Sequence, residues 1–281
     1  MPYVEKCPIG CDAPLEKSNF VSDYVLLRCL KCGQLIRQSS EDFYIRSMES
    51  FNIPSGTSPT GNNIKRSHKR YSKHLKKIRA NSRGMVSRDE AKLLDIGCSS
   101  GSFLQFAKKF GYVVSGVEPA PLAAATAIRR GLDVKQGFLE HINYPDNHFD
   151  VITMFEVIEH VKEPVSLLRE CHRILTEGGI IAIGTGNTDS WTVSFMKGEW
   201  DYFEGPGHIS FFNPISMCKL ASESGFDLIR LDTRRVSICR REKASKAGYF
   251  VSKIAMELLS IPAKLLNKGH DALFFLKKDR P

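Results

Sequence analysis

The chain has 281 residues, which suits one domain and a smaller appendage, since domains usually hold about 50–250 residues. Hydrophobic residues make up 42% of it, so it can bury a full core. Forty Lys and Arg against 31 Asp and Glu give a formal charge of +9, which favours an anionic partner such as nucleic acid, a nucleotide sugar or a membrane surface. The first residues lack an apolar signal segment, and no uncharged run approaches the roughly 20 residues of a spanning helix. These features argue against a secreted or integral membrane protein, and we expect a cytoplasmic one.

Four of the eight cysteines lie near the N-terminus as two pairs, Cys7 with Cys11 and Cys29 with Cys32. In a reducing compartment cysteines are thiols or metal ligands rather than disulfides. Two pairs across a short hairpin can set four thiolates tetrahedrally about zinc, which leaves no open coordination position. We therefore predict a zinc-ribbon-like segment over residues 1–40 with a structural zinc. The alternative is a set of buried free thiols.

Residues 41–91 are predicted to be a linker and a basic helix. The stretch 38–62 is rich in Ser, Pro, Gly and Asn and is typical of a linker or a substrate-side loop. Between Lys65 and Arg83, Tyr71, Leu75 and Ile78 recur at helical spacing on a basic surface. This helix either binds phosphates along its basic surface or packs its single apolar stripe on the core. Both interpretations can be true at once.

The stretch from Lys92 to Phe103 changes from a buried strand to a glycine turn and then to the start of a helix. Gly97 and Gly101 bracket the turn, and a second apolar run ends in Glu118 about twenty residues later. Glycines let the backbone approach a ligand, and the first amides of the helix are free donors. A carboxylate after the second strand can accept both ribose hydroxyls of a nucleoside. The pattern predicts a nucleotide-like ligand.

This arrangement, with the motif DIGCSSG, resembles the class I S-adenosylmethionine-dependent methyltransferases from about Lys92 to Phe226. Ser99 stands where many relatives have a further glycine, and Cys98 is interpreted as a small packing residue of the turn. Where many relatives have an acid for the adenine amine, this chain has Phe138, for which we expect an apolar contact. The resemblance implies S-adenosylmethionine as cofactor and this set of cofactor-binding residues: Asp95, Gly97, Cys98, Gly101, Glu118, Phe138 and Phe155.

Strands and helices alternate through the rest of the chain. We expect strands at 112–117, 132–138, 148–155, 180–185, 226–233 and 272–277, and helices at 120–130, 163–175 and 213–224. Such βα units form a parallel sheet with ligands at the carboxyl ends of its strands. In the methyltransferases that the chain resembles, the last strand inserts antiparallel. The expected fold is therefore α/β, a Rossmann-like doubly wound seven-stranded sheet over residues 92–281 with a small N-terminal zinc-binding appendage.

The candidate acceptor site follows the strand at 148–155. Glu156, Glu159 and His160 are at i, i+3 and i+4, which puts them on one face if the segment turns helically, and His208 follows the next strand. This Glu-x-x-Glu-His with a later His resembles the ubiquinone-pathway O-methyltransferases and the small-RNA 2′-O-methyltransferases. The resemblance implies that all four residues bind a divalent ion, magnesium or manganese, against the acceptor hydroxyl. In the alternative, His160 is a general base without metal, or a structural residue. We expect His160, Glu159 and His208 to be catalytic.

Residues 244–268 are amphipathic, with Phe250, Ile254 and Leu258 on one side, lysines elsewhere, and Pro262 expected to interrupt the helix. Such a segment either lies on an anionic membrane surface as a peripheral contact or caps its own fold.

We predict a methyltransferase that transfers a methyl group to a hydroxyl of a small-molecule acceptor. Resemblance to methyltransferases with four N-terminal cysteines favours a sugar, a sugar nucleotide or a saccharide, as in polysaccharide biosynthesis. One alternative is an RNA methyltransferase of the 2′-O type that uses the ribbon and the basic helix. Another is a non-catalytic nucleic-acid-binding protein, which the intact Asp95, Gly97, Gly101 and Glu118 argue against. The identity of the acceptor and the oligomeric state stay open.

Overall fold

The computed structural model describes residues 5–20, 24–49, 61–82, 90–240 and 245–279. Within these residues the main sheet has seven strands in the order β10-β11-β8-β7-β4-β5-β6. Strands β4 to β8 are parallel to one another, and β11 runs antiparallel between β8 and β10. The bounds are β4 (Lys92–Ile96), β5 (Val113–Glu118), β6 (Asp133–Gln136), β7 (Phe149–Phe155), β8 (Leu175–Gly186), β10 (Phe226–Arg234) and β11 (Asp271–Lys278). This sheet confirms the predicted α/β Rossmann-like fold, including the antiparallel last strand.

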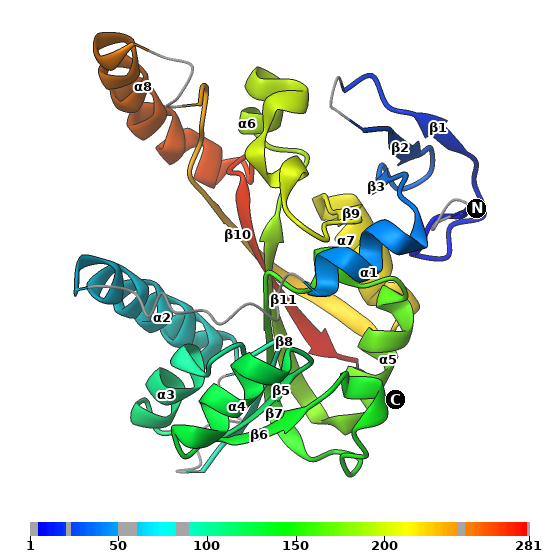
Figure 1. Cartoon of the computed structure of the whole chain (residues 1–281), viewed down its shortest axis with the longest axis vertical. Helices are drawn as coiled ribbons and strands as arrows, with labels where there is room; N and C mark the ends of the chain where they lie inside the picture. The colour runs from blue at the N-terminus through cyan, green and yellow to red at the C-terminus, as the bar shows by residue number, and fades with distance from the viewer. Residues whose placement is uncertain (1–4, 21–23, 50–60, 83–89, 241–244, 280–281) are drawn as a thin grey trace.

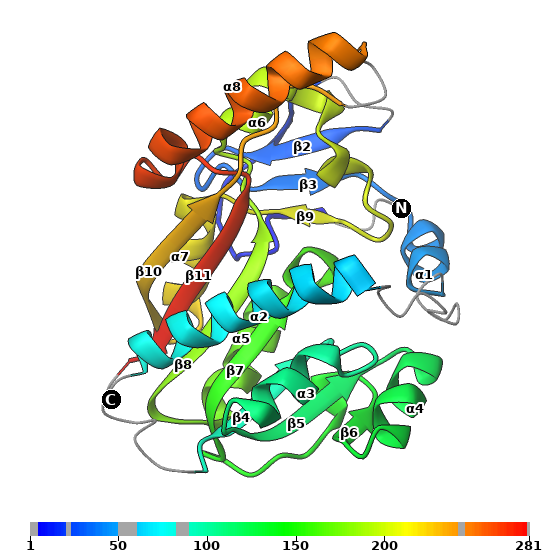
Figure 2. The ribbon, with the colours of Figure 1, turned by 90° about the vertical axis from the view of Figure 1, so that its left-hand side faces the viewer.

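Three helices cover one face of the sheet: α2 (Gly61–Asn81), α3 (Ser102–Lys109) and α4 (Pro121–Arg129) (Figure 2). The stripe predicted on α2 packs inward, because Leu75 and Ile78 are fully buried and Tyr71 lies edge-on to Phe103 at 5.4 Å between ring centroids. The packing interpretation of the basic helix is therefore confirmed. Most of its lysines and arginines that the structure describes face solvent, which leaves the phosphate interpretation open.

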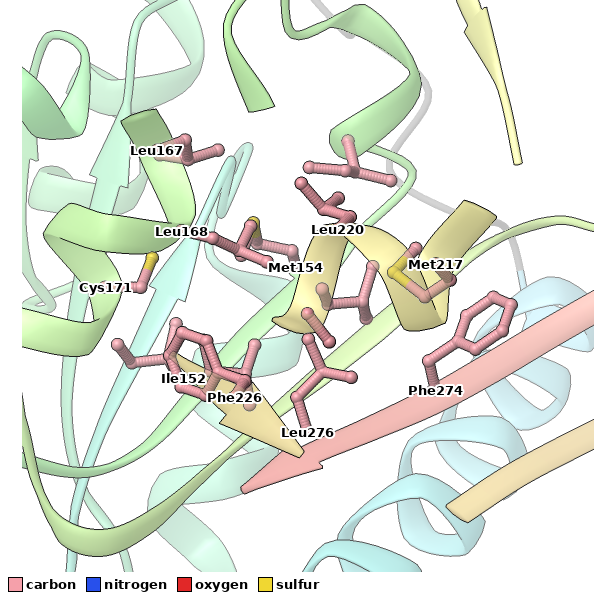
Figure 3. Close-up of a cluster of buried hydrophobic side chains, with 14 of the residues drawn as sticks. Ile152, Met154, Leu167, Leu168, Cys171, Met217, Leu220, Phe226, Phe274 and Leu276 are labelled. Atoms are coloured by element: carbon pink, nitrogen blue, oxygen red, sulfur yellow. The ribbon is translucent and has the colours of Figure 1, made fainter. Parts of the chain in front are cut away.

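The opposite face of the sheet is covered by α5 (Pro164–Ile174) and α7 (Pro214–Glu223). Leu168 and Leu220 from these helices meet Ile152 and Phe274 from the strands in one buried cluster (Figure 3). Each such side chain contributes about 1.5–3 kcal/mol on burial. Asn213 caps α7, since its side chain accepts a hydrogen bond from the Ser216 N–H at 2.9 Å.

A second, smaller sheet contains the N-terminal segment. Its strands are β1 (Leu15–Lys17), β2 (Leu26–Cys29), β3 (Leu35–Arg37) and β9 (Ser210–Phe211), in that order. The first three come from the predicted ribbon, but β9 belongs to the methyltransferase region and pairs Phe211 with Leu35. The ribbon therefore shares backbone hydrogen bonds with the part of the chain that carries His208.

The predicted linker at 38–62 is partly wrong, because α1 (Glu41–Glu49) lies within it; residues 50–60 are outside the described residues. Ser40 acts as a helix cap, its hydroxyl accepting a hydrogen bond from the Phe43 N–H at 3.2 Å. Glu41 and Asp42 in the first turn interact favourably with the positive end of the helix dipole and so stabilise the helix. The polar residues that indicated a linker are thus in part a helix start.

Short helices complete the described structure: α6 (Trp191–Met196) and the 3-10 turns Leu139–His141, Ile158–His160, Lys197–Glu199 and Asp201–Glu204. Strand β8 is longer than expected and begins at Leu175, because it continues through Gly178 and Gly179 instead of starting after them. The pairing register of β8 with β7 shifts next to this glycine pair.

Helix α8 (Lys246–Leu265) lies at the outer edge of the molecule and packs against β10 (Figure 1). The prediction that Pro262 interrupts it is wrong: the helix continues, because a proline this near the end removes only one hydrogen bond of the last turns. Ala263 is buried, so this side caps the fold, but Phe250, Leu258 and Ile261 face solvent. None of the helices formed by the described residues is both long and apolar enough to cross a membrane.

Candidate cofactor and acceptor site

The turn between β4 and α3 requires its glycines. Gly97 and Gly101 have φ of +69° and +79°, which is the left-handed region. A Cβ atom on Gly97 would lie 2.5 Å from Cγ2 of Val157, and one on Gly101 would overlap Leu132. Ser99, which stands where many relatives have a glycine, also has a positive φ of +50°. The serine thus adopts a left-handed conformation that a glycine would adopt more easily. The turn therefore keeps its tight form at the carboxyl edge of the sheet.

Glu118 is tied to this turn. Its Oε2 accepts a hydrogen bond from the Ser99 N–H at 2.7 Å, and its Oε1 accepts one from the Ala120 N–H at 2.8 Å. Burial raises the pKa of the carboxyl, while the two backbone hydrogen bonds oppose that rise. Each carboxylate oxygen keeps a further lone pair, so the group can still accept ribose hydroxyls.

Asp95 in β4 and Cys98 in the turn are both buried. The Thr153 hydroxyl donates a hydrogen bond of 2.6 Å to Oδ1 of Asp95, and burial raises the pKa of this carboxyl to about 7. Burial also raises the pKa of the Cys98 thiol. Its sulfur is packed so closely that a Cβ on Gly116 would lie 2.7 Å from it, which fits the interpretation of Cys98 as a packing residue.

The two predicted aromatic contacts differ in their surroundings. The Phe155 ring lies between Phe103 and His74, at centroid distances of 5.0 and 4.9 Å, so α2 closes over this side of the turn. Phe138 is 44% exposed and has the His141 ring 6.2 Å away. A half-exposed aromatic face beside β6 is suited to stack on a flat ligand.

The acceptor side is built around Glu159, which has no exposed surface. The Tyr202 hydroxyl donates to its Oε1 at 2.5 Å, and the Thr185 hydroxyl donates to its Oε2 at 2.9 Å. Burial and the charge of Glu159 raise the pKa of Tyr202 well above its ordinary value, so the phenol stays protonated as a donor. These two hydroxyls hold the buried carboxylate in one orientation.

His208 lies against the same carboxylate. Its Nδ1–H donates to the Tyr202 carbonyl at 2.8 Å, which leaves the lone pair of the neutral ring on Nε2, 3.9 Å from Oε1 of Glu159. Burial lowers the pKa of His208, although Glu159 acts in the opposite direction. The His160 ring is 4.7 Å from that of His208 between centroids. Ligand atoms of Glu159, His160 and His208 all lie within 4.8 Å of one another.

Glu156 does not join this group, so the prediction that it shares one helical face with Glu159 and His160 is wrong. It sits at the end of β7 with φ of +57°, before the 3-10 turn at Ile158–His160 begins. Its side chain is solvent-accessible, but surrounding protein atoms and the nearby charge of Glu159 raise its pKa. Glu156 is therefore a neighbour of the buried Glu159 carboxylate, outside the group of three ligand atoms that lie within 4.8 Å of one another, and its role as a metal ligand stays a prediction.

Tyr202 and Thr185 were not predicted from the sequence. Thr185 is at the end of a strand, where its hydroxyl reaches Glu159, and the only sequence signal is its place at the carboxyl edge. Tyr202 comes six residues before His208 in an aromatic-rich segment whose backbone also holds the His208 ring. Both are recognisable only once the buried carboxylate is seen to need donors.

The four N-terminal cysteines come together as their spacing predicted. All four are buried, are free of disulfides and have sulfur atoms within 4.8 Å of one another, with 3.7 Å between Cys7 and Cys32. Zinc bound tetrahedrally at about 2.3 Å sets its sulfur ligands about 3.8 Å apart. The donor set and its geometry therefore fit a structural zinc held by Cys7, Cys11, Cys29 and Cys32.

The fold and the glycine turn define an S-adenosylmethionine-dependent methyltransferase. The chain matches the family described as "Methyltransferase domain" over residues 65–231, more than half of its length, and it belongs to that family. Two solved structures share this fold with the chain, both S-adenosylmethionine-dependent methyltransferases. The one from Archaeoglobus fulgidus is 18% identical with a TM-score of 0.52, covering 75% of this chain and 94% of that one. The one from Mesorhizobium loti is 15% identical with a TM-score of 0.51, covering 73% and 97%.

Among curated proteins, the chain is similar to ubiquinone biosynthesis O-methyltransferases. The one from Yersinia pestis is 31% identical over 120 residues, which is 40% of this chain and 50% of that protein. The chain thus spans about half the length of the curated relatives it matches. The similarity supports the enzyme class, and the acceptor must be inferred from the site.

Proposed function

We propose that the protein methylates a hydroxyl oxygen of a small polar acceptor, with His160, His208 and Glu159 at the reacting oxygen. The observation that supports this most is the fixed His208 ring, whose Nε2 lone pair adjoins a fully buried carboxylate. Similarity to the ubiquinone-pathway O-methyltransferases also favours oxygen as the acceptor atom. The four-cysteine segment favours a sugar, sugar nucleotide or saccharide, by resemblance alone.

When bound, S-adenosylmethionine supplies an electrophilic methyl group on a sulfonium. The residues of the chain have three tasks in such a transfer. Glu118 accepts the ribose hydroxyls beside the turn at Gly97–Gly101. An imidazole nitrogen of the histidine pair takes the proton of the acceptor hydroxyl as the oxygen becomes a nucleophile, and the adjacent Glu159 carboxylate stabilises the resulting imidazolium. The third task is to hold the acceptor oxygen in line with the methyl group, which lowers the entropic part of the activation barrier.

The same cluster could instead hold magnesium or manganese, since three ligand atoms lie within 4.8 Å of one another. A short exposure to a chelator separates the two mechanisms. With a metal mechanism, turnover falls, cofactor binding persists, and added magnesium or manganese restores turnover. With a general base, turnover survives. Zinc content must be measured in the same samples, because chelators also strip cysteine sites over time.

Transfer of labelled methyl from S-adenosylmethionine to polysaccharide, to nucleotide sugars and to RNA tests the acceptor class. Labelling of the first two supports the proposal. Labelling of RNA alone would replace it with the second candidate, an RNA methyltransferase, which the exposed lysines along α2 favour. Binding of S-adenosylmethionine without transfer to any acceptor would favour a non-catalytic protein.

A further inference from the structure

A cavity of about 450 Å³ opens between the ribbon and the segment that precedes His208. Arg37 at the end of β3 lines it from the ribbon, Phe43 and Arg46 line it from α1, and Glu204 and Pro206 line it from the other side. None of these residues belongs to the cofactor turn or to the predicted acceptor cluster. The cavity therefore shares no residue with those two sites, although Glu204 and Pro206 lie in the chain between Tyr202 and His208.

The charges in this cavity are paired, with one exception. Arg46 forms an ion pair with Asp42, and Glu204 forms one with Arg240 at 2.6 Å. Arg37 has no carboxylate within ion-pair distance among the described residues. Its guanidinium instead lies 3.6 Å from the centre of the Tyr24 ring and 4.3 Å from that of Phe43.

These two ring contacts restrain the Arg37 guanidinium but use none of its N–H donors. A stacked arginine keeps its edge available for a planar or tetrahedral anion, which it binds through two parallel hydrogen bonds. Arg37 is also half-buried, and burial lowers its pKa. Partial burial of a cation without a nearby anion costs free energy. A negatively charged ligand would supply the missing anion and recover part of that cost.

Backbone hydrogen bonds connect Arg37 to the acceptor cluster through Ile209. The Arg37 N–H donates to the Ile209 carbonyl at 2.9 Å, and the Ile209 N–H donates to the Glu159 carbonyl at 2.9 Å. From α1, the Tyr44 hydroxyl donates to the His160 carbonyl at 3.0 Å. The positive charge of Arg37 also contributes to the lowered pKa of His208. The strand that carries Arg37 is thus bonded to the backbone of the acceptor cluster, and the charge of Arg37 acts on His208.

We infer that this cavity binds an anionic group, phosphate or carboxylate, of the methyl acceptor, and that Arg37 is the residue that binds it. The inference rests on the proposed function, since it names the chemistry of the acceptor of that same site. The ribbon then has a role beyond stability, because it supplies the specificity-determining arginine. Neutral sugars are poor acceptors under this scheme, whereas sugar phosphates or uronates are good ones.

Inorganic pyrophosphate and glucuronate are suitable probes for the two sources of charge. We expect one of them to shift the side-chain Nε–H NMR signal of Arg37, which is assigned by its loss in Arg37→Gln. Arg37→Gln should weaken binding of that probe by about tenfold or more. The matched control is Arg46→Gln, which removes an arginine of the same cavity that is already paired, and which should change the affinity less than threefold. A signal that neither probe moves would overturn the inference.

Affinity for S-adenosylmethionine separates this outcome from failure of the proposed function. It should be equal in wild type, Arg37→Gln and Arg46→Gln, because the cofactor turn is elsewhere. A wild-type chain that binds S-adenosylmethionine normally but binds neither pyrophosphate nor glucuronate refutes only the anion site. A wild-type chain that fails to bind S-adenosylmethionine refutes the proposed function, whatever the probes do. If Arg37→Gln also loses cofactor affinity, the residue is structural and the inference fails.

The exposed side of α8 carries a second, independent observation. Five large apolar side chains on it are 65–78% exposed: Phe250, Val251, Leu258, Ile261 and Leu265. At 100° per residue they form one continuous stripe opposite buried Ala263, with exposed Lys253, Lys264 and Glu257 along one edge. A stripe this continuous is unusual on the surface of a monomer.

We propose that this stripe lies on an anionic lipid surface. A 20-residue helix is about 30 Å long and 10 Å wide, so pairing with a second copy would cover only about 300 Å² per partner, against about 800 Å² in stable interfaces. Apolar burial with lysines at the edge is the pattern of interfacial helices, and the net charge of +9 adds attraction to acidic headgroups.

Flotation with vesicles of phosphatidylglycerol and phosphatidylcholine tests this proposal. Wild type should float with the mixed vesicles and much less with pure phosphatidylcholine, and the double variant Leu258→Ser/Ile261→Ser should lose most of the binding. Ile215→Ser is the matched control, because Ile215 is 69% exposed on α7. Equal flotation of wild type and the α8 variant would overturn the proposal. So would a dimer in light scattering that the α8 variant converts to a monomer.

Discussion

The cofactor turn and the acceptor cluster lie at the same edge of the sheet, but the chain builds them differently. The cofactor turn is local: Gly97, Gly101 and Glu118 belong to one βαβ unit, and Glu118 is bonded to the turn itself. The acceptor cluster takes Glu159 and His208 from segments far apart in the sequence, and β9 joins it to the ribbon. A change in the ribbon should therefore lower the rate of methyl transfer and leave cofactor affinity unchanged. This asymmetry can be tested.

The largest effect is expected from His208→Ala. Loss of a positioned base or ligand should lower kcat by about 10²- to 10⁴-fold, because general acid–base catalysis contributes that much. The dissociation constant of S-adenosylmethionine should stay within threefold. Steady-state kinetics and calorimetry measure the two quantities. His172→Ala is the control, since His172 lies at the surface beside Asp279 and should be close to neutral. Unaltered kcat in His208→Ala would remove His208 from the mechanism.

At the cofactor turn, Glu118→Ala is expected to have a smaller effect, and this effect is on cofactor affinity. It should weaken S-adenosylmethionine binding by about 1.5–3 kcal/mol, the value of hydrogen bonds to a charged group, or about ten- to 150-fold. Loss of the bonds from Ser99 and Ala120 adds to this by loosening the turn. At saturating cofactor, kcat should change far less than in His208→Ala. Calorimetry that finds normal affinity would contradict the role of Glu118.

These two sides also differ in how far the sequence predicts them. Strand, glycine turn and acid follow one another within a single unit, so local spacing predicted the cofactor turn and the sheet around it. Tyr202 could not be predicted, because its role depends on a hydrogen bond to Glu159, 43 residues earlier in the chain. Glu156 falls outside the predicted helical face, because its backbone is in the left-handed region and helical spacing does not hold there. The exposed side of α8 was also unpredictable, since an amphipathic pattern does not say which side meets the core.

The asymmetry is sharpest in Cys29→Ser. Cys29 is fully buried, and we expect its loss to release about one zinc per chain and to loosen the ribbon. Because β3 pairs with β9, turnover should fall about tenfold, while affinity for S-adenosylmethionine stays within threefold. Elemental analysis, kinetics and calorimetry follow the three quantities. Cys218→Ser, at an exposed cysteine outside the cluster, is the control. Equal losses of turnover and cofactor affinity would mean that the two sides are not separable.

The smallest effect is expected from pH. Burial lowers the pKa of His208, so the folded state keeps the ring neutral below the ordinary imidazole value of 6.5. As a base, His208 should make kcat/KM rise with pH through a value below 6.5 and stay level between about pH 7 and 8.

The unfolded chain binds this proton near pH 6.5 and the folded chain does not, so the free energy of unfolding should decrease as pH falls below that value. His74, whose pKa burial lowers to about 3, adds to the same loss. His74→Gln should therefore flatten the acid side of the stability curve and leave the kcat/KM profile in place, because His74 contacts Phe155 and not Glu159. A kcat/KM profile that still rises above pH 7 would assign the proton transfer to a group other than His208.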